Sequence, residues 1–173
     1  MSGSGGPAHA GGELFIGSVP QGNQVLTAPL AWTNPATGAH MLIVTNSFGI
    51  SASQIIVDTT NANEPALQKT GAPNWLHTGT AVAGSATSTG GTSPVIANGV
   101  LYYAGGSGLL ALDPATGATL WNDTAMGVAT ATKPSAFHKQ SPIVIAGKLF
   151  VPDDNGKFWA YGLADEIFGN GFD

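Results

Sequence analysis

Ser93-Pro94-Val95-Ile96-Ala97-Asn98-Gly99-Val100-Leu101-Tyr102-Tyr103-Ala104 occurs a second time in this chain of 173 residues, in a related form. The second form is Ser141-Pro142-Ile143-Val144-Ile145-Ala146-Gly147-Lys148-Leu149-Phe150-Val151-Pro152, which aligns without a gap at a shift of 48 residues (141 − 93). In each form a Ser-Pro pair leads into an apolar run, a two-residue turn that ends in glycine, and a second apolar run with an aromatic residue. Because Asn-Gly favours two-residue β-hairpins, the repeat predicts two related hairpins.

Turn residues in and after the first copy divide residues 92–122 into four short apolar segments. These segments are Thr92–Ala97, Val100–Ala104, Leu109–Leu112 and Ala118–Asn122. Four antiparallel strands joined by tight turns, repeated at roughly this period, are typical of a β-propeller blade. The sequence therefore predicts an all-β fold with about three such repeats. Closed propellers have roughly four to eight blades, so we expect a partial propeller or a ring completed by oligomerisation.

The repeat also sets the expected domain organisation. We assign residues 1–12 to a Gly-rich linker or tag, 13–163 to the repeats and 164–173 to a C-terminal tail. The repeats divide at approximately 25–79, 80–127 and 128–163. In the first of them we expect strands at Leu26–Thr33, His40–Thr45 and Ser51–Val57, a weak fourth at Ala66–Lys69, and a long loop over Thr70–Gly79. The third lacks a fourth strand, and Glu13–Val19 is the candidate to close it, in the same chain or in a neighbour.

Composition excludes several classes of function. Only 9% of the residues are charged, none is arginine and none is cysteine. Nucleic-acid binding needs clustered Lys and Arg, so that class is disfavoured. No apolar run reaches the roughly 18 residues of a membrane span. The N-terminus lacks the features of a signal peptide, while abundant Gly, Thr, Ala, Asn and Ser are a compositional hint of a secreted bacterial protein.

The second unit resembles the repeat of the pyrroloquinoline-quinone (PQQ)-like β-propellers. That pattern is present here as Ser93-Pro94, Asn98-Gly99, Leu109-Leu110-Ala111-Leu112-Asp113-Pro114-Ala115-Thr116-Gly117 and Leu120-Trp121. The resemblance is specific across residues 92–121, good across 138–163 and faint across 25–75. It implies structural roles in docking one blade on the next for Gly117, Trp121 and the pairs Ser93-Pro94 and Ser141-Pro142.

The C-terminal sequence carries a second resemblance. Ile167-Phe168-Gly169-Asn170-Gly171-Phe172-Asp173 is similar to a short tail that is common on secreted proteobacterial proteins. Together the two resemblances imply the C-terminal portion of a secreted or periplasmic bacterial propeller.

The same resemblance bears on function. Quinoprotein dehydrogenases of this family use an Asp base, a calcium ion, an Arg near the quinone and, often, a vicinal Cys pair, but this chain has no Arg and no Cys. We therefore expect a non-catalytic binding or scaffold module, with no catalytic residue, metal or cofactor. The alternatives are a fragment of a quinoprotein sugar or alcohol dehydrogenase, which would need PQQ and calcium, and a carbohydrate-binding module that uses exposed aromatic rings.

Candidate ligand residues are few. His138 precedes a Ser-Pro strand, and the neighbours Phe158 and Trp159 must point to opposite sides of a strand. Asp153 and Asp154 could offer oxygens to calcium, but their Asp-Asp-Asn-Gly sequence favours a hairpin turn. An open arc of three blades leaves two apolar faces bare, and exposed patches of that kind indicate an interface. We therefore expect one of three states: a two-fold dimer that forms a six-bladed ring, association with the missing blades of a parent protein, or a tight closed form of the single chain.

Overall fold

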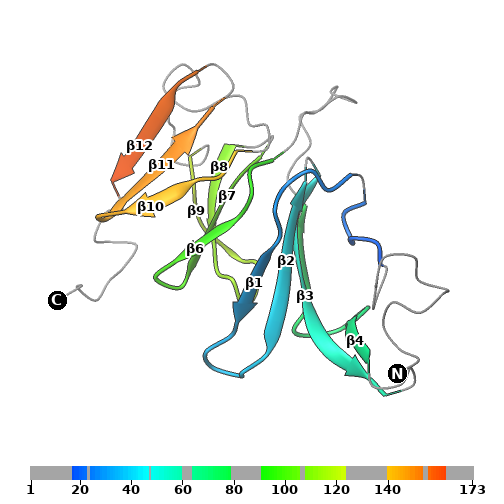
Figure 1. Cartoon of the computed structure of the whole chain (residues 1–173). Coiled ribbons are helices and arrows are strands. Elements are labelled where there is room, and N and C mark those ends of the chain that lie inside the picture. Colours follow the sequence, from blue (N-terminus) through cyan, green and yellow to red (C-terminus); the bar gives the residue numbers. More distant parts are fainter. Residues whose placement is uncertain are drawn as a thin grey trace.

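The computed structural model describes residues 17–22, 24–46, 48–59, 64–78, 91–105, 108–123, 140–153 and 156–162. These residues form three antiparallel sheets and contain no helix (Figure 1). The predicted all-β class is confirmed. Within the same residues there is consequently no helix that is long and apolar enough to cross a membrane.

The first sheet contains five strands: β1 (Leu30–Thr33), β2 (His40–Asn46), β3 (Gly49–Asp58), β4 (Glu64–Leu67) and β5 (Trp75–Thr78). β1, β2 and β3 follow one another as antiparallel neighbours. β3 is long enough to pair twice, because its first residues pair with β5 and its last residues pair with β4. The order β1-β2-β3-β5 is thus a four-stranded unit to which β4 adds a short extension.

Two expectations for this sheet need correction. The long loop expected at Thr70–Gly79 contains β5, which is fixed by pairing with the distant Gly49–Ala52 and not by a local sequence signal. The strand expected from Leu26 begins only at Leu30. Pro29 precedes it, and proline has no N–H to donate to a strand ladder.

The second sheet has the order β6 (Val95–Ala97), β7 (Val100–Gly105), β8 (Gly108–Leu112) and β9 (Thr119–Asn122). Asn98 and Gly99 join the first two strands with φ angles of 50° and 75°, the left-handed values that a tight primed hairpin turn requires. The third sheet has the order β10 (Ile143–Ile145), β11 (Lys148–Pro152) and β12 (Phe158–Gly162). Its first turn, Ala146-Gly147, repeats this geometry with φ angles of 50° and 66°.

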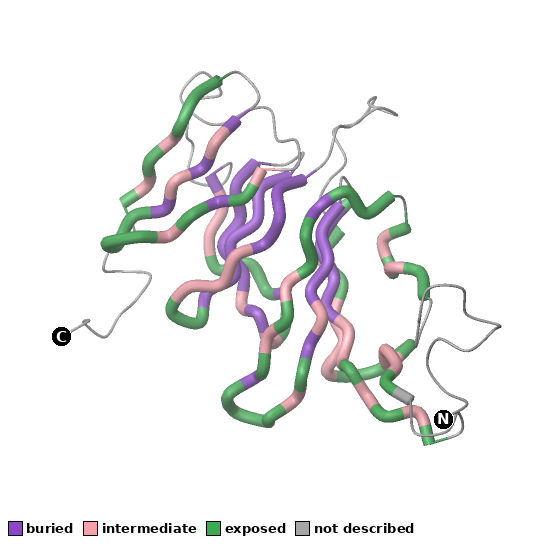
Figure 2. Tube along the Cα trace, viewed as in Figure 1, coloured by how far each residue is buried: buried purple, intermediate pink, exposed green. Residues whose placement is uncertain are grey.

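The second sheet lies between the other two and is buried on both faces (Figure 2). Alternate residues of a strand point to opposite faces, so β7 and β8 divide into two sets. One set packs on the first sheet and consists of Leu101, Tyr103, Leu110 and Leu112, against Met41, Ile43, Ile50 and Ala52. The other packs on the third sheet and consists of Val100, Tyr102, Ala104, Leu109 and Ala111, against Leu149 and Val151. This arrangement explains why β7 and β8 are apolar throughout.

Buried hydrogen bonds connect the sheets. The Tyr103 hydroxyl donates to the Asn46 carbonyl at 2.9 Å, and the Thr45 hydroxyl donates to the Thr92 carbonyl at 2.8 Å. The Ser93 amide donates to the Gln140 carbonyl at 2.8 Å. These bonds fix the sheets as a stack, which does not close into a ring within the described residues.

Part of the outer face of the first sheet, which points away from the second sheet, lies under residues 17–22 and 24–29, the covering segment. Gln21 Nε2 donates to the Val44 carbonyl at 3.1 Å, and Asn46 Nδ2 donates to the Gly22 carbonyl. Of the predicted closing strand, residues 13–16 lie outside the described part of the chain. Residues 17–19 are not in a strand and line a pocket on the first sheet.

Candidate interaction surface

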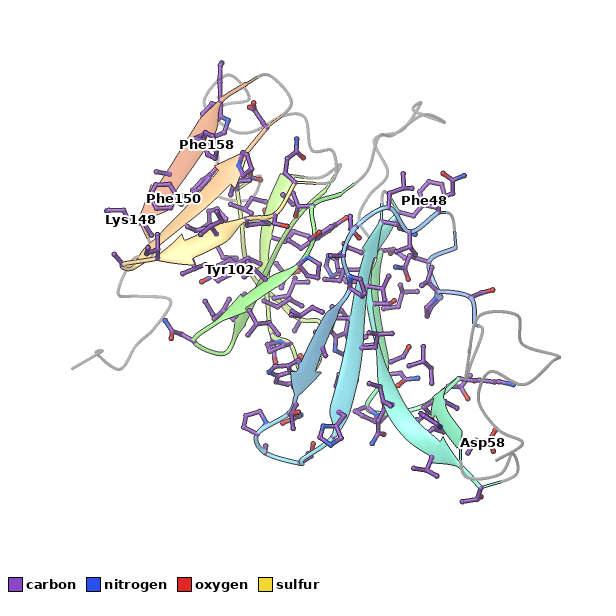
Figure 3. The ribbon with its side chains drawn as sticks, in the orientation of Figure 1. Phe48, Asp58, Tyr102, Lys148, Phe150 and Phe158 are labelled. Atoms are coloured by element: carbon purple, nitrogen blue, oxygen red, sulfur yellow. The ribbon has the colours of Figure 1, made fainter. Side chains whose placement is uncertain are left out.

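The outer face of the third sheet forms one end of the stack. It consists of side chains on β10, β11 and β12 that alternate with those packed on the second sheet, namely Ile143, Ile145, Lys148, Phe150 and Phe158. Ile143 is 55% exposed, Ile145 is 61% exposed and Phe158 is 75% exposed. Figure 3 labels Lys148, Phe150 and Phe158 on this sheet and Tyr102 on the second. Apolar side chains thus gather on a sheet face that nothing covers among the described residues.

The 48-residue repeat shows what covers the equivalent face elsewhere in the molecule. Phe150 of the third sheet aligns with Tyr102 of the second, and both point away from the preceding sheet. Tyr102 is 1% exposed because the third sheet packs on it, whereas Phe150 is only half-buried. The outer face of the third sheet therefore has the positions of a sheet–sheet interface, but no further sheet packs on it in the described part of the chain.

Burial of this face would be favourable. Moving an Ile or Phe side chain fully out of water contributes about 1.5–3 kcal/mol, and three such side chains here are more than half exposed. Lys148 is the single charged side chain among the five that define the face. It replaces the buried Val100 of the second sheet, so the third sheet presents one cation on an otherwise apolar surface.

The structure brings Asp153 and Trp159 together at one end of the third sheet. Asp153 is 6% exposed, its Oδ1 accepts the Lys157 amide at 3.0 Å and its Oδ2 accepts Trp159 Nε1 at 2.7 Å. The ammonium of Lys157 lies 5.6 Å from the centroid of the Trp159 ring. Both carboxylate oxygens hold the β11–β12 turn and its indole, which favours the turn interpretation of Asp153 over a calcium ligand. Asp154 and His138, the other two candidates, lie outside the described residues.

Gly117 and Trp121 both lie at contacts between sheets. Gly117 packs on the Trp75 indole of the first sheet, and Trp75 Nε1 donates to the Pro114 carbonyl at 2.9 Å. Trp121 makes an edge contact with Tyr161 of the third sheet, with ring centroids 5.9 Å apart. The sequence did not identify Trp75 as the partner of Gly117. Its spacing of 46 residues from Trp121 (121 − 75), close to the repeat, was the available signal.

The two Ser-Pro pairs differ in their surroundings. Ser93 is buried, and its Oγ accepts the amide of Ala28 at 3.0 Å. Pro94 and Pro142 are buried, while Ser141 is exposed. Ser93 therefore ties the covering segment to the second sheet, whereas Ser141 makes no equivalent bond within the described residues.

The three tyrosines are not poised for proton transfer near neutral pH. Burial raises the pKa of Tyr102 to about 12 and the pKa of Tyr103 still further. Burial, and secondarily the Asp123 carboxylate, raises the pKa of Tyr161 to about 12. Each phenol therefore stays protonated and serves as packing material between the sheets.

Within the described residues no group of three or more His, Cys, Asp or Glu side chains is placed to hold a metal ion. No protein-family model matches the sequence, and no curated protein matches it either. The outer face of the third sheet is the strongest candidate for a functional surface.

Proposed function

We propose that this chain is a non-catalytic binding or scaffold module built from PQQ-like propeller blades, and that it binds another β-sheet through the outer face of the third sheet. The observation that carries the proposal is the equivalence of Phe150 and Tyr102: Tyr102 is buried under a neighbouring sheet, whereas Phe150 is half-buried and has no such sheet over it among the described residues. The secreted-type tail and low charge support a location outside the cytoplasm.

The assignment to propeller blades rests on the way the sheets are built and stacked. The first and second sheets each contain a four-stranded antiparallel unit of consecutive strands, apart from the β4 extension. Successive sheets pack face to face, and the Trp75 indole of one docks on the Gly117 turn of the next. Sheets that stack in this way continue until a face is covered, because an exposed apolar face of this kind favours association.

A second copy of the chain is the partner we favour. Because the covering segment lies on the first sheet, at the other end of the stack, a partner can reach the third sheet without displacing it. Two third sheets then meet face to face about a two-fold axis. With that axis across the strands, Lys148 of one copy lies over the end that carries Phe158 in the other, since Lys148 pairs with Gly162 and Phe158 with Pro152. A lysine over a phenyl ring is a favourable cation–π contact.

The composition of the face suits a protein better than a sugar. Phe150 and Phe158 offer rings for stacking, but Lys148 is the one polar side chain among the five that define the face. A carbohydrate site also needs polar groups that pair with the sugar hydroxyls.

Substitution of Ile145 by lysine tests the proposal, with Val57→Lys as the matched control. Ile145 is 61% exposed on the third sheet and Val57 is 60% exposed on the first, so the two changes remove equally exposed apolar side chains. We expect sedimentation equilibrium to show a dimer for the wild type and for Val57→Lys. For Ile145→Lys we expect the dissociation constant of the dimer to rise at least tenfold. If both substitutions raised the dissociation constant equally, or if neither raised it, this assignment of the interface would be contradicted.

A further inference from the structure

A pocket of about 260 Å³ lies at the opposite end of the stack from the outer face of the third sheet. The covering segment forms its roof, and β2, β3 and Leu67 of β4 form its floor and side. The roof is tied to β2 by two hydrogen bonds, one from the Gln21 side chain to the Val44 carbonyl and one from the Asn46 side chain to the Gly22 carbonyl. The pocket is therefore a feature of the fold that the proposed function leaves unexplained.

The floor has an apolar half and a hydroxyl half. Leu42 pairs with Ser53, and Val44 pairs with Ser51, so the four side chains form a rectangle on one face of the sheet. Ser51 is only 2% exposed, yet neither serine hydroxyl makes a hydrogen bond within the described part of the chain. A secluded hydroxyl normally pairs with a protein group, a water or a ligand. The two hydroxyls thus offer hydrogen bonds to whatever occupies the pocket.

The remainder of the lining restricts the charge of an occupant. Val19, Val25 and Leu67 contribute apolar surface, and no residue that lines the pocket carries a charge. Bringing an ion into such a site costs several kcal/mol unless an opposite charge compensates it. The lining therefore selects neutral molecules.

We propose that this pocket binds a small neutral alcohol or phenol with a mostly apolar body. The hydroxyl of the ligand pairs with Ser51 and Ser53, and its body packs on Leu42, Val44 and the valines of the covering segment. A protein cavity of about 150 Å³ accommodates benzene, so in proportion this pocket accommodates about ten heavy atoms. The bound molecule holds the covering segment on the first sheet.

Calorimetric titration of the full chain with 2-naphthol tests this proposal, with naphthalene and 2-naphthoate as matched ligands of the same shape. We expect one saturable site for 2-naphthol, about tenfold weaker binding of naphthalene, which lacks the hydroxyl, and at least tenfold weaker binding of the anion. In the double variant Ser51→Ala/Ser53→Ala the preference for 2-naphthol over naphthalene disappears, while the affinity for naphthalene is retained. Because neither hydroxyl has a hydrogen-bond partner among the described residues, the double variant is expected to unfold at the same urea concentration as the wild type.

Ile145→Lys is the control for binding elsewhere, because a naphthol molecule could also adsorb to the outer face of the third sheet. Binding of 2-naphthol should be unchanged in this variant, whatever its effect on association. The proposal is overturned if 2-naphthol does not saturate one site, if it binds no tighter than naphthalene, or if its preference survives the double serine substitution. Loss of binding in Ile145→Lys would likewise assign it to the other end of the molecule.

Discussion

At the scale of single residues, two turns of nearly identical sequence have different roles. Asn34-Pro35-Ala36-Thr37-Gly38 joins β1 to β2, and Asp113-Pro114-Ala115-Thr116-Gly117 joins β8 to β9. The final glycines have φ angles of 74° and 72°, so both need the left-handed region. Only Gly117 is also in close contact, because a Cβ there would lie 2.5 Å from Trp75 Cε3 while a Cβ on Gly38 would meet nothing within 4 Å.

Alanine substitution of these two glycines separates the cost of a strained backbone from the contribution of the Gly117–Trp75 contact to stability. We expect Gly38→Ala to lower the free energy of unfolding by about 1 kcal/mol, which is the cost of a left-handed alanine. Gly117→Ala should lower the free energy of unfolding by about 1–3 kcal/mol more than Gly38→Ala does, because the methyl group displaces the Trp75 indole. Urea unfolding measures both. Equal losses in the two variants would show that the docking contact is not stabilising.

The buried tyrosines predict how stability depends on alkaline pH. A tyrosine in the unfolded chain titrates near pH 10, whereas the pKa of Tyr102 and of Tyr161 is raised to about 12 in the folded protein. Groups whose folded pKa is raised stabilise the fold fully below about pH 10, and that contribution is lost as the pH rises from about 10 towards 12.

All three tyrosines of the chain have a raised pKa, so tyrosinate absorbance reports the folded state directly. We expect little tyrosinate at about pH 11 in the folded protein and nearly complete ionisation in urea. A folded midpoint near pH 10 would show that the tyrosines are in contact with water.

At the scale of elements, the carboxylates of two turns are held differently. Asp113 accepts the Ala115 amide at 2.8 Å, a bond that Asn34 makes with the Ala36 amide at 2.9 Å in the first turn. The second oxygen of Asp113 accepts the Thr116 hydroxyl at 2.9 Å, and a hydroxyl can also accept a hydrogen bond from an amide. Asp153 instead accepts two N–H donors, one on each oxygen. An amide side chain can therefore replace Asp113 but can satisfy only one of the two donors at Asp153.

Asparagine substitution at these positions tests how the β11–β12 turn is held. We expect Asp153→Asn to lower the free energy of unfolding by about 1–3 kcal/mol, since one buried donor loses its charged acceptor. Asp113→Asn should cost less than about 1 kcal/mol, because Asn34 shows that an amide fits the same place. Both values come from urea unfolding at neutral pH. A larger loss at Asp113 than at Asp153 would contradict the assigned roles.

The sequence predicted the elements that depend on local patterns. β6, β7, β8 and β11 occur at or near the predicted residues, because each adjoins a turn whose residues demand a left-handed backbone. β5 was missed, since its four residues follow Gly71 and Pro73 and are fixed only by pairing with β3. The outer face of the third sheet was partly predictable, because the repeat places Phe150 on the side of Tyr102. The pocket was not predictable, because the covering segment is placed by bonds across the tertiary structure.

At the scale of the whole molecule, the two ends of the stack differ in what covers them. The sequence predicted two bare apolar faces, and the covering segment lies over only part of the one on the first sheet, where Leu76 and Val57 remain 46% and 60% exposed. The outer face of the third sheet keeps Ile143, Ile145 and Phe158 more than half exposed. The proposed two-fold contact between two copies would bury the outer faces of both third sheets at once.

The mass of the wild-type chain in solution, measured by light scattering coupled to size exclusion, tests this account most directly. One chain has a mass of 17.4 kDa. If the outer faces of two third sheets cover one another, the mass at micromolar to submillimolar concentration is twice that of one chain. A mass that remains that of a single chain over the whole range would show that the face stays exposed, and would contradict the self-associating module proposed here.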